Sequence, residues 1–289
     1  MGHTRPNSLP PSFLFKKPPR MNSDPEDPAD ILNDALEFLS GQVVEDEVIK
    51  YGDLQLTVAA KEGKANTLLA DHLFSPGLFL AERIERGPLS AHKLNVIELG
   101  AGCALPSLLL STVATPPATV VVTDYPDPGI LGNLARNVQR NSHLVSPGCT
   151  VWCCGYEWGT NVAPLLAQTG NGRAGDGYDM VILSDLLHFH SSHAVLVSSI
   201  NALLGPSPNA RIHVAAGNYT KPEVCDNFLR LAVQAGFIFD EILPLDDERD
   251  WLGSSTVSGL DKTALKIPQG CLSILGWSSG LMWPEGEKK

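Results

Sequence analysis

The chain has 289 residues, of which 43% are hydrophobic and 18% are charged, a balance that is typical of globular proteins and excludes a largely disordered chain. Its formal net charge of −11 offers no basic surface to follow a phosphate backbone, so no nucleic acid is expected as a partner. An acidic enzyme could attract a basic peptide or a cationic amine, although acidic surfaces also serve solubility alone.

The first 65 residues are predicted to form a tail and an extension. Residues 1–28 contain seven prolines, which break helices and strand ladders, so this segment is predicted to be a disordered tail. Residues 29–65 are predicted to hold an amphipathic helix over 30–39 and two short strands, 43–49 and 54–59, around Tyr51-Gly52-Asp53. Residues 66–289 are then expected to form a single domain.

That domain alternates strands and helices. Pro76 and Gly77 should open a helix within the apolar stretch 68–84. Five strand–helix units follow, and they demand a parallel sheet with right-handed crossovers. Two last strands flank a polar insertion, 246–268, near the sheet edge. The predicted fold class is therefore α/β, a doubly wound, mostly parallel sheet of seven strands. The strands are predicted over 94–99, 119–123, 150–154, 179–184, 211–216, 237–243 and 271–275, and the helices begin at 105, 128, near 162, 192 and 222.

The first strand of this domain runs through Glu98 into the turn Gly100-Ala101-Gly102. Glycines at such a turn let the backbone approach a bound nucleoside, although an ordinary tight turn is the alternative. A dinucleotide site would have a third glycine where Leu105 stands, and no Lys or Arg occurs from 100 to 123 to bind a pyrophosphate. S-adenosylmethionine fits better, because Glu98 could attract its cationic end.

Asp124 stands at the tip of the second strand, about 20 residues after the glycine turn. A carboxylate at this position can accept hydrogen bonds from both ribose hydroxyls of a nucleoside. The alternative is that Asp124 caps the helix that begins near Pro126.

Polar residues follow the fourth and fifth strands, where a methyl acceptor would meet the cofactor. Asp185 and His188 are the predicted catalytic residues, with His190 as a further candidate, because an amine must lose a proton before it is methylated. His193 could complete a metal site, but without a carboxylate set no metal is predicted. An ordinary surface loop is the other alternative, and Tyr219 could either wall in a cationic amine or pack against this loop.

Four segments in this order make the chain similar to the fungal nicotinamide N-methyltransferase-like proteins. The segments are 96–102, 123–128, 155–159 and 184–187, and the similarity covers residues 68–243. That family groups with the seven-strand, S-adenosylmethionine-dependent lysine methyltransferases. It includes enzymes that methylate the N-terminus and a neighbouring lysine of translation elongation factor 1A.

The resemblance implies roles for particular residues. Gly100 and Gly102 would line the methionine and ribose side of the cofactor, Asp124 would hold the ribose, and Trp158 would cover the adenine. Ser184 would close the side of the pocket at the fourth strand. Many relatives carry a tryptophan in contact with the cofactor where Phe74 stands here, which weakens the expectation of a shared substrate.

The sequence thus predicts an S-adenosylmethionine-dependent N-methyltransferase for a protein amine, either a lysine or an N-terminal amine. A small, nicotinamide-like amine acceptor is the alternative reaction, and a non-catalytic cofactor-binding scaffold and an NAD-dependent oxidoreductase are rivals of other classes. The six cysteines form no C-x-x-C pair, and neither a membrane span nor a secretory signal is evident. A cytoplasmic protein is therefore expected, with the nucleus as a second compartment and no membrane partner.

Overall fold

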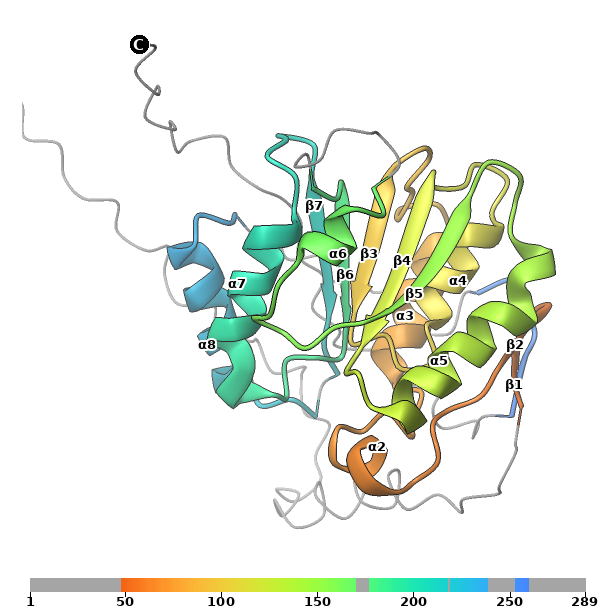
Figure 1. Cartoon of the computed structure of the whole chain (residues 1–289), viewed down its shortest axis with the longest axis horizontal. Coiled ribbons are helices and arrows are strands. Elements are labelled where there is room, and N and C mark those ends of the chain that lie inside the picture. Colours follow the sequence, from red (N-terminus) through yellow and green to blue (C-terminus); the bar gives the residue numbers. More distant parts are fainter. Residues whose placement is uncertain (1–47, 170–176, 218, 239–252, 260–289) are drawn as a thin grey trace, which may run out of the picture.

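The computed structural model describes residues 48–169, 177–217, 219–238 and 253–259. At its centre lies a parallel sheet of five strands in the order β5-β4-β3-β6-β7, with helices on both faces (Figure 1). The α/β class and the five core strands are confirmed. The strands are β3 (Asn95–Leu99), β4 (Thr119–Asp124), β5 (Thr150–Gly155), β6 (Met180–Ser184) and β7 (Arg211–Ala215).

Several sequence predictions lie outside the described residues. These are the tail over 1–28, the helix over 30–39, the strand over 271–275 and all but two residues of the strand over 237–243. The seven-strand count and the domain boundaries therefore remain predictions.

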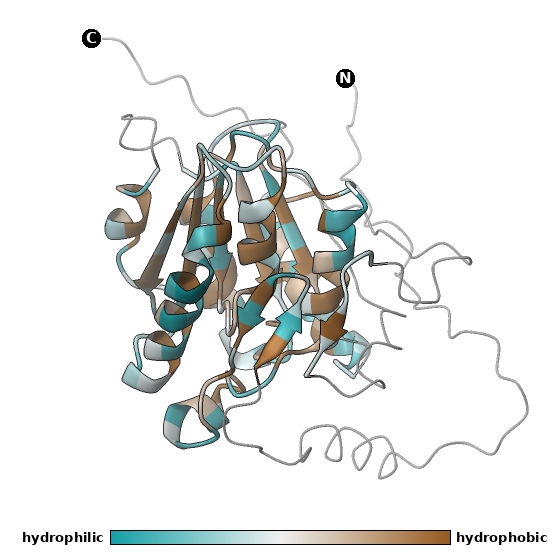
Figure 2. Ribbon diagram, turned by 90° about the vertical axis from the view of Figure 1, so that its right-hand side faces the viewer, coloured by the Kyte–Doolittle hydropathy of each residue, from teal (hydrophilic) through white to brown (hydrophobic). Residues whose placement is uncertain are grey.

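The central strands are apolar because both faces of the sheet are covered. Every side chain of β3 and β4 is buried, whereas β5, at the edge, is half exposed. Continuous apolar runs of this kind are typical of parallel strands between two helical layers. Figure 2 shows the same arrangement as brown strands enclosed by helices that are teal on their outer faces.

Two apolar cores separate the sheet from its helices. Leu78, Leu108 and Leu134 belong to the core on one face, and Leu196 and Phe228 belong to the core on the other. Five of the described helices carry proline in their first turn, where the missing N–H costs nothing. The first face carries α3 (Ser75–Glu85), α4 (Leu105–Thr112) and α5 (Pro128–Asn141), and the second α6 (Ala163–Leu166), α7 (His193–Leu203) and α8 (Pro222–Gln234).

Most helix starts agree with the prediction, including the new helix at Pro76. Near Val162 only the four-residue α6 forms, and two single-turn 3₁₀ helices occur at Ser142–Leu144 and His190–Ser192. None of the described helices has the length and apolar content that crossing a bilayer requires. The described cysteines are all free thiols, and only Cys103 and Cys225 among them are fully buried.

The extension before the main sheet forms a small antiparallel sheet, β2-β1-β8, followed by the short helix α2 (Gly63–Thr67). Its strands are β1 (Ile49–Tyr51), β2 (Leu54–Leu56) and β8 (Val257–Ser258). The predicted hairpin is confirmed, but its first strand runs to Tyr51 rather than ending at Ile49, and its second strand ends at Leu56 rather than at residue 59. Residues 43–47 of the predicted first strand lie outside the described residues. The polar stretch predicted as an insertion at the edge of the main sheet instead supplies β8, which pairs with β1.

Three asparagines on α5 tie this extension to the core. Asn141 accepts from the Gln55 N–H and donates to the Gln55 carbonyl, both at 2.9 Å. Asn137 brackets Thr57 in the same way, at 2.9 and 2.7 Å, and Asn133 donates to the Thr57 carbonyl at 2.7 Å. Carboxamides at successive helical turns thus take the place of a strand beside the open edge of β2.

Strand order reverses at β3, which pairs with β4 on one side and with β6 on the other. Loops that leave two such strands diverge to opposite faces of the sheet and open a crevice between them. The glycine turn after β3 and the segment Ser184-Asp185 after β6 both lie at this crevice.

Candidate active site

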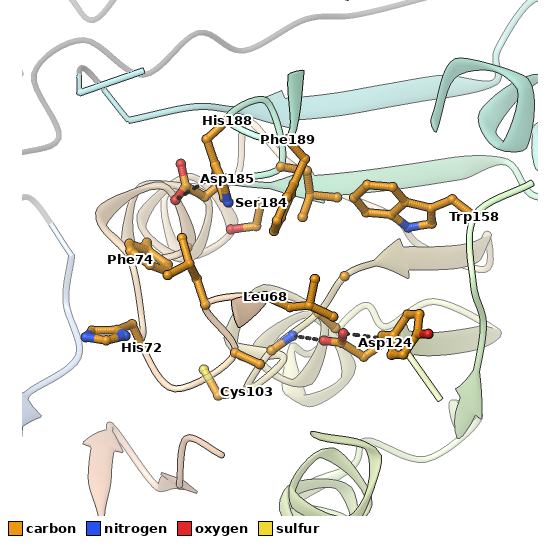
Figure 3. A pocket seen from close by; sticks show the side chains of 18 of the residues that line it. Leu68, His72, Phe74, Cys103, Asp124, Trp158, Ser184, Asp185, His188 and Phe189 are labelled. Carbon is orange, nitrogen blue, oxygen red and sulfur yellow. Dashed lines mark hydrogen bonds and ion pairs between the residues drawn. The ribbon is translucent and has the colours of Figure 1, made fainter. Parts of the chain in front are cut away.

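A cavity of about 390 Å³ opens at the carboxyl ends of β3, β4, β5 and β6 (Figure 3). This volume falls within the range of about 300–1,000 Å³ that is common for small-molecule sites. Asp124 and Trp158 lie toward one end of the cavity, and Phe74 and Asp185 lie toward the other. The two ends are described in turn as the nucleoside end and the acceptor end.

The glycine turn adopts a left-handed backbone. Gly100 and Gly102 have φ values of +57° and +56°, which side chains rarely tolerate. A Cβ on Gly100 would lie 2.7 Å from Leu186 Cδ2, so a larger residue there would also force this side chain to shift. A Cβ on Gly102 would meet nothing within 4 Å, and both glycines and Ala101 line the cavity.

Asp124 is fixed beside this turn by two backbone amides. The Gly102 N–H donates to one carboxylate oxygen and the Tyr125 N–H donates to the other, both at 2.7 Å. Burial raises the pKa of Asp124, and the two N–H donors oppose that shift. The alternative role as a helix cap is wrong, because Asp127 caps α5 by accepting from the Gly129 and Ile130 N–H groups.

Aromatic side chains form the wall across from Asp124. Trp158 follows β5, is only partly buried, and meets the Phe189 ring edge-on at a centroid distance of 5.8 Å. It therefore lines the cavity and does not serve only as core. Ser184 closes β6 and also lines the cavity.

Glu98 lies behind the glycine turn and is not part of the cavity wall. It is fully buried; one carboxylate oxygen accepts from the Ser107 N–H at 3.3 Å, and the other has no hydrogen-bond partner among the described residues. Burial raises the pKa of Glu98 to about 8. In the free protein it is therefore largely neutral near pH 7, and direct contact with a cofactor would need a change in this arrangement.

Asp185 is a buried polar residue at the acceptor end (Figure 3). Its backbone is left-handed, with φ of +61°, an uncommon conformation that recurs at functional sites. Its carboxylate accepts from the Tyr219 hydroxyl at 2.5 Å and from the Gly217 N–H at 3.2 Å. Burial raises the pKa of Asp185 to about 7, while these two bonds act to lower it.

His188 and Phe74 complete the acceptor end. His188 Nδ1 lies 3.9 Å from the Asp185 carboxylate, beyond hydrogen-bond length, and its Nε2 is buried with no hydrogen-bond partner among the described residues. Burial lowers the pKa of His188 to about 4, so the ring is neutral near pH 7. The Phe74 ring lies 6.5 Å from His188 and 6.2 Å from Tyr219, so the three rings surround the approach to Asp185.

The three histidines of the metal alternative do not converge. His190 is exposed, whereas the buried His193 uses Nε2 on the Leu187 carbonyl, at 2.7 Å, and Nδ1 on Asn227, at 3.0 Å. Within the described residues no group of His, Cys, Asp and Glu is arranged to hold a metal ion.

Comparison with known proteins assigns the chain to a family. Residues 54–232 match a family model described as lysine methyltransferase. The chain belongs to this family. A relative from Schizosaccharomyces pombe, named protein N-terminal and lysine N-methyltransferase efm7, is 31% identical over 62% of this chain and 69% of its own. A Neurospora crassa protein of the same name is 30% identical over 77% of this chain and 76% of its own.

The chain is therefore an S-adenosylmethionine-dependent methyltransferase, as the sequence predicts. Among solved structures, an S-adenosylmethionine-dependent methyltransferase from Aquifex aeolicus superposes with a TM-score of 0.49 and 12% identity, over 74% of this chain and 98% of that one.

The cavity of this methyltransferase suits a cationic cofactor that carries no phosphate. Among the described residues, no Lys or Arg lines the cavity, whereas Asp124 and Asp185 both line it. A pyrophosphate would find no side-chain cation there, which argues against an NAD-dependent oxidoreductase.

Sequence reasoning missed one wall of the cavity. Residues 68–70, 72 and 73, between α2 and α3, line it beside Phe74, and Leu69 has a left-handed φ of +57°. No local pattern marks this loop, because its position depends on packing of Ala65 and Ala70 against Ile130 of α5. Tyr156 and Phe189 were missed for a similar reason, since an aromatic residue after a strand usually packs in a core.

Proposed function

We propose that this methyltransferase transfers a methyl group from S-adenosylmethionine to a protein amine, either a lysine side chain or an N-terminal amine. The names of its relatives support a protein acceptor and do not favour the small-amine alternative. The observation that carries the proposal is that a single cavity joins a glycine turn and a ribose-type carboxylate at one end to a buried carboxylate among aromatic rings at the other.

At the nucleoside end, Asp124 would accept hydrogen bonds from the ribose hydroxyls. Its two backbone N–H donors fix the carboxylate before the cofactor arrives, which lowers the entropic cost of binding. Gly100, Ala101 and Gly102 would line the methionine and ribose side, and Trp158 would cover the adenine. Bound S-adenosylmethionine supplies an electrophilic methyl group on a sulfonium.

Phe74, at the acceptor end, and Ser184, at the end of β6, would also contact the cofactor, since both line the cavity. Phe74 can take the stacking role of the tryptophan found in many relatives. Glu98 would not contact the cationic end in this arrangement, because it lies behind the turn and is largely neutral near pH 7.

At the acceptor end, Asp185 would bind the arriving ammonium and take its proton. An ammonium has no lone pair, so the proton must leave before the nitrogen can attack the methyl carbon. Sequence alone favours His188 for this step. The pKa values favour Asp185, because a carboxyl of pKa about 7 holds a proton far better near neutrality than an imidazole of pKa about 4. His188, Phe74 and Tyr219 would then form the walls around the cation.

The acceptor class can be tested with labelled cofactor. Purified protein is incubated with S-adenosylmethionine carrying a radioactive methyl group and a lysate, beside the Asp124→Ala variant. Label in a protein band, at a lysine or an N-terminal residue and absent with Asp124→Ala, is the expected result. Elongation factor 1A, which the sequence resemblance suggests, is the first purified acceptor to test.

Label found only in small molecules would support the nicotinamide-like alternative instead. Cofactor binding without any transfer would support the non-catalytic scaffold, which family membership disfavours.

A further inference from the structure

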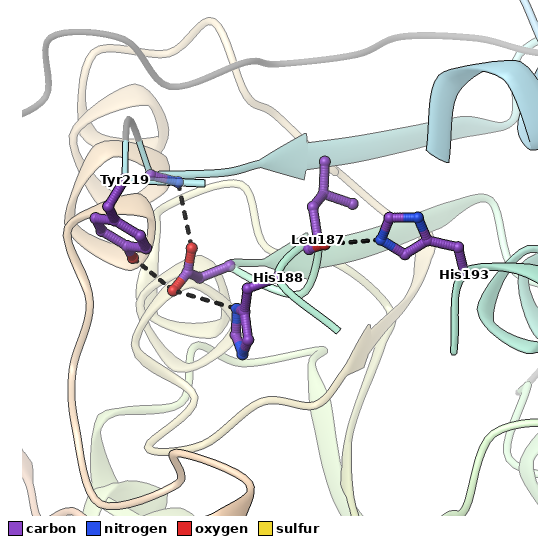
Figure 4. Close-up of polar contacts among 6 residues, drawn as sticks. Leu187, His188, His193 and Tyr219 are labelled. Atoms are coloured by element: carbon purple, nitrogen blue, oxygen red, sulfur yellow. Dashed lines mark hydrogen bonds and ion pairs between the residues drawn. The ribbon is translucent and has the colours of Figure 1, made fainter. Parts of the chain in front are cut away.

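We propose that Tyr219 is a positioning residue for methyl transfer, which acts through Asp185 by orienting its carboxylate toward the acceptor. This inference rests on the proposed function, since it takes Asp185 as the group that meets the acceptor amine. Tyr219 reaches Asp185 from the loop after β7, whereas Asp185 belongs to the loop after β6 (Figure 4). The bond therefore joins two different loops, through residues that lie 34 positions apart in the sequence.

The bond of Tyr219 is the strongest that the Asp185 carboxylate makes within the described residues. At 2.5 Å it has the length of a charge-assisted O–H to carboxylate bond, whereas the Gly217 N–H lies at 3.2 Å. His188, on the same loop as Asp185, is too far for a hydrogen bond at 3.9 Å. The orientation of the carboxylate is thus set from the β7 side.

The ring of Tyr219 is itself held by packing. A Cβ on Gly217 would lie 2.2 Å from Tyr219 Cζ and 2.3 Å from Cε1, so the ring occupies the space that any larger residue would need. Phe74 lies on the ring's cavity side, at a centroid distance of 6.2 Å. Gly217 is therefore required here for close approach, and even alanine should displace the hydroxyl from Asp185.

The ionisation of Asp185 depends on this hydrogen bond, because the other titratable groups that face Asp185 carry no charge near pH 7. Besides Tyr219, these groups are His188, on the same loop as Asp185, and the Cys225 thiol on α8, whose pKa the charge of Asp185 helps to raise. Burial lowers the pKa of His188 to about 4 and raises the pKa of Cys225 to about 11, so neither carries charge near pH 7. Without the Tyr219 hydroxyl, the carboxylate of Asp185 would lose a main source of stabilisation and stay protonated to higher pH.

The test compares Tyr219→Phe and Gly217→Ala with Thr220→Val. Thr220 lies in the same loop and its buried hydroxyl makes no hydrogen bond to any described residue, so Thr220→Val is a matched hydroxyl deletion. Turnover is measured as a function of pH, as the transfer of the radioactive methyl group from saturating S-adenosylmethionine to the protein acceptor. Tyr219→Phe and Gly217→Ala should lower turnover about ten-fold at pH 7. They should also move the acid side of the pH profile of turnover up by about one pH unit, so that activity recovers at high pH. Thr220→Val should match the wild type.

A second measurement needs no acceptor. Carbon-13 NMR of labelled aspartate carboxyls, with the Asp185 signal assigned from Asp185→Asn, gives the pKa of Asp185 in the free protein. We expect Tyr219→Phe to raise it by about one unit. An unchanged pKa together with an unshifted acid side of the pH profile would overturn the inference. A raised pKa in a protein that methylates no acceptor would uphold the Tyr219–Asp185 coupling while refuting the proposed function.

Discussion

Among single residues, two aspartates three positions apart have different tasks. Asp124 lines the cavity and is held by the Gly102 and Tyr125 amides, whereas Asp127 is only partly buried at the start of α5 and accepts from the first amides of that helix. From sequence alone, a helix cap remained an alternative role for Asp124. The difference lies in hydrogen bonds that only the folded chain forms.

Replacing these two aspartates should separate binding from stability. Asp124→Ala should weaken S-adenosylmethionine binding by about 2–3 kcal/mol, since charge-assisted hydrogen bonds to the ribose are lost. Asp127→Ala, the matched control, should cost about 1 kcal/mol of stability and leave affinity unchanged. Calorimetric titration and thermal unfolding measure the two quantities. Unchanged affinity in a folded Asp124→Ala protein would remove Asp124 from the site.

Glu98 should make stability depend on pH. Its pKa in the folded protein is about 8 and its ordinary value is 4.5, so the stability that its bound proton contributes is fully present below about pH 4 and is lost as pH rises through 8. Glu98→Gln should therefore raise the free energy of unfolding at pH 8 by about 1 kcal/mol or more, with little effect at pH 4. The exposed Glu62→Gln is the control. Equal urea midpoints of wild type and Glu98→Gln at pH 8 would contradict this account.

At the scale of elements, the βα units could be predicted because buried parallel strands leave continuous apolar runs. The pairing of β8 with β1 could not, since Val257 and Ser258 lie in a polar stretch about 200 residues from their partners and leave no local signal. The same holds for the contact between α5 and β2. Asn133, Asn137 and Asn141 share a helix face, but their partners are backbone groups that no sequence pattern marks.

Asn137 should be a main anchor of the extension. Its carboxamide brackets Thr57 and also donates to the Cys103 carbonyl at 3.3 Å, next to the glycine turn. Asn137→Ala should destabilise the protein by about 2 kcal/mol, because buried backbone groups lose their partners. Gln139→Ala, an exposed change on the same helix, should cost less than about 0.5 kcal/mol. Urea unfolding compares the two, and equal costs would show that the ladder contributes little.

At the scale of the whole molecule, the site is assembled from loops that follow four different strands and from the segment before α3. The glycine turn and Asp124 could be located from sequence because each stands at the end of a recognisable strand, whereas Trp158 and Ser184 came from the family resemblance. The ring cluster of Phe74, His188 and Tyr219 around Asp185 depends on the strand order, which brings β6 beside β7. The sequence therefore predicted which residues lie at the acceptor end, but not which role each of them has.

The proposed division of the cavity into a nucleoside end and an acceptor end is tested most directly by the turnover of Asp185→Asn. Methylation of the protein acceptor is followed at saturating S-adenosylmethionine across pH, with His188→Gln beside it and the cofactor Kd measured for each protein. Wild-type turnover should rise with pH through about 7 as Asp185 loses its proton. Asp185→Asn should lose about ten-fold or more in turnover and lack that rise, with its cofactor Kd nearly unchanged, while His188→Gln should keep the rise. Wild-type turnover in Asp185→Asn, or a parallel loss of cofactor binding, would contradict the division.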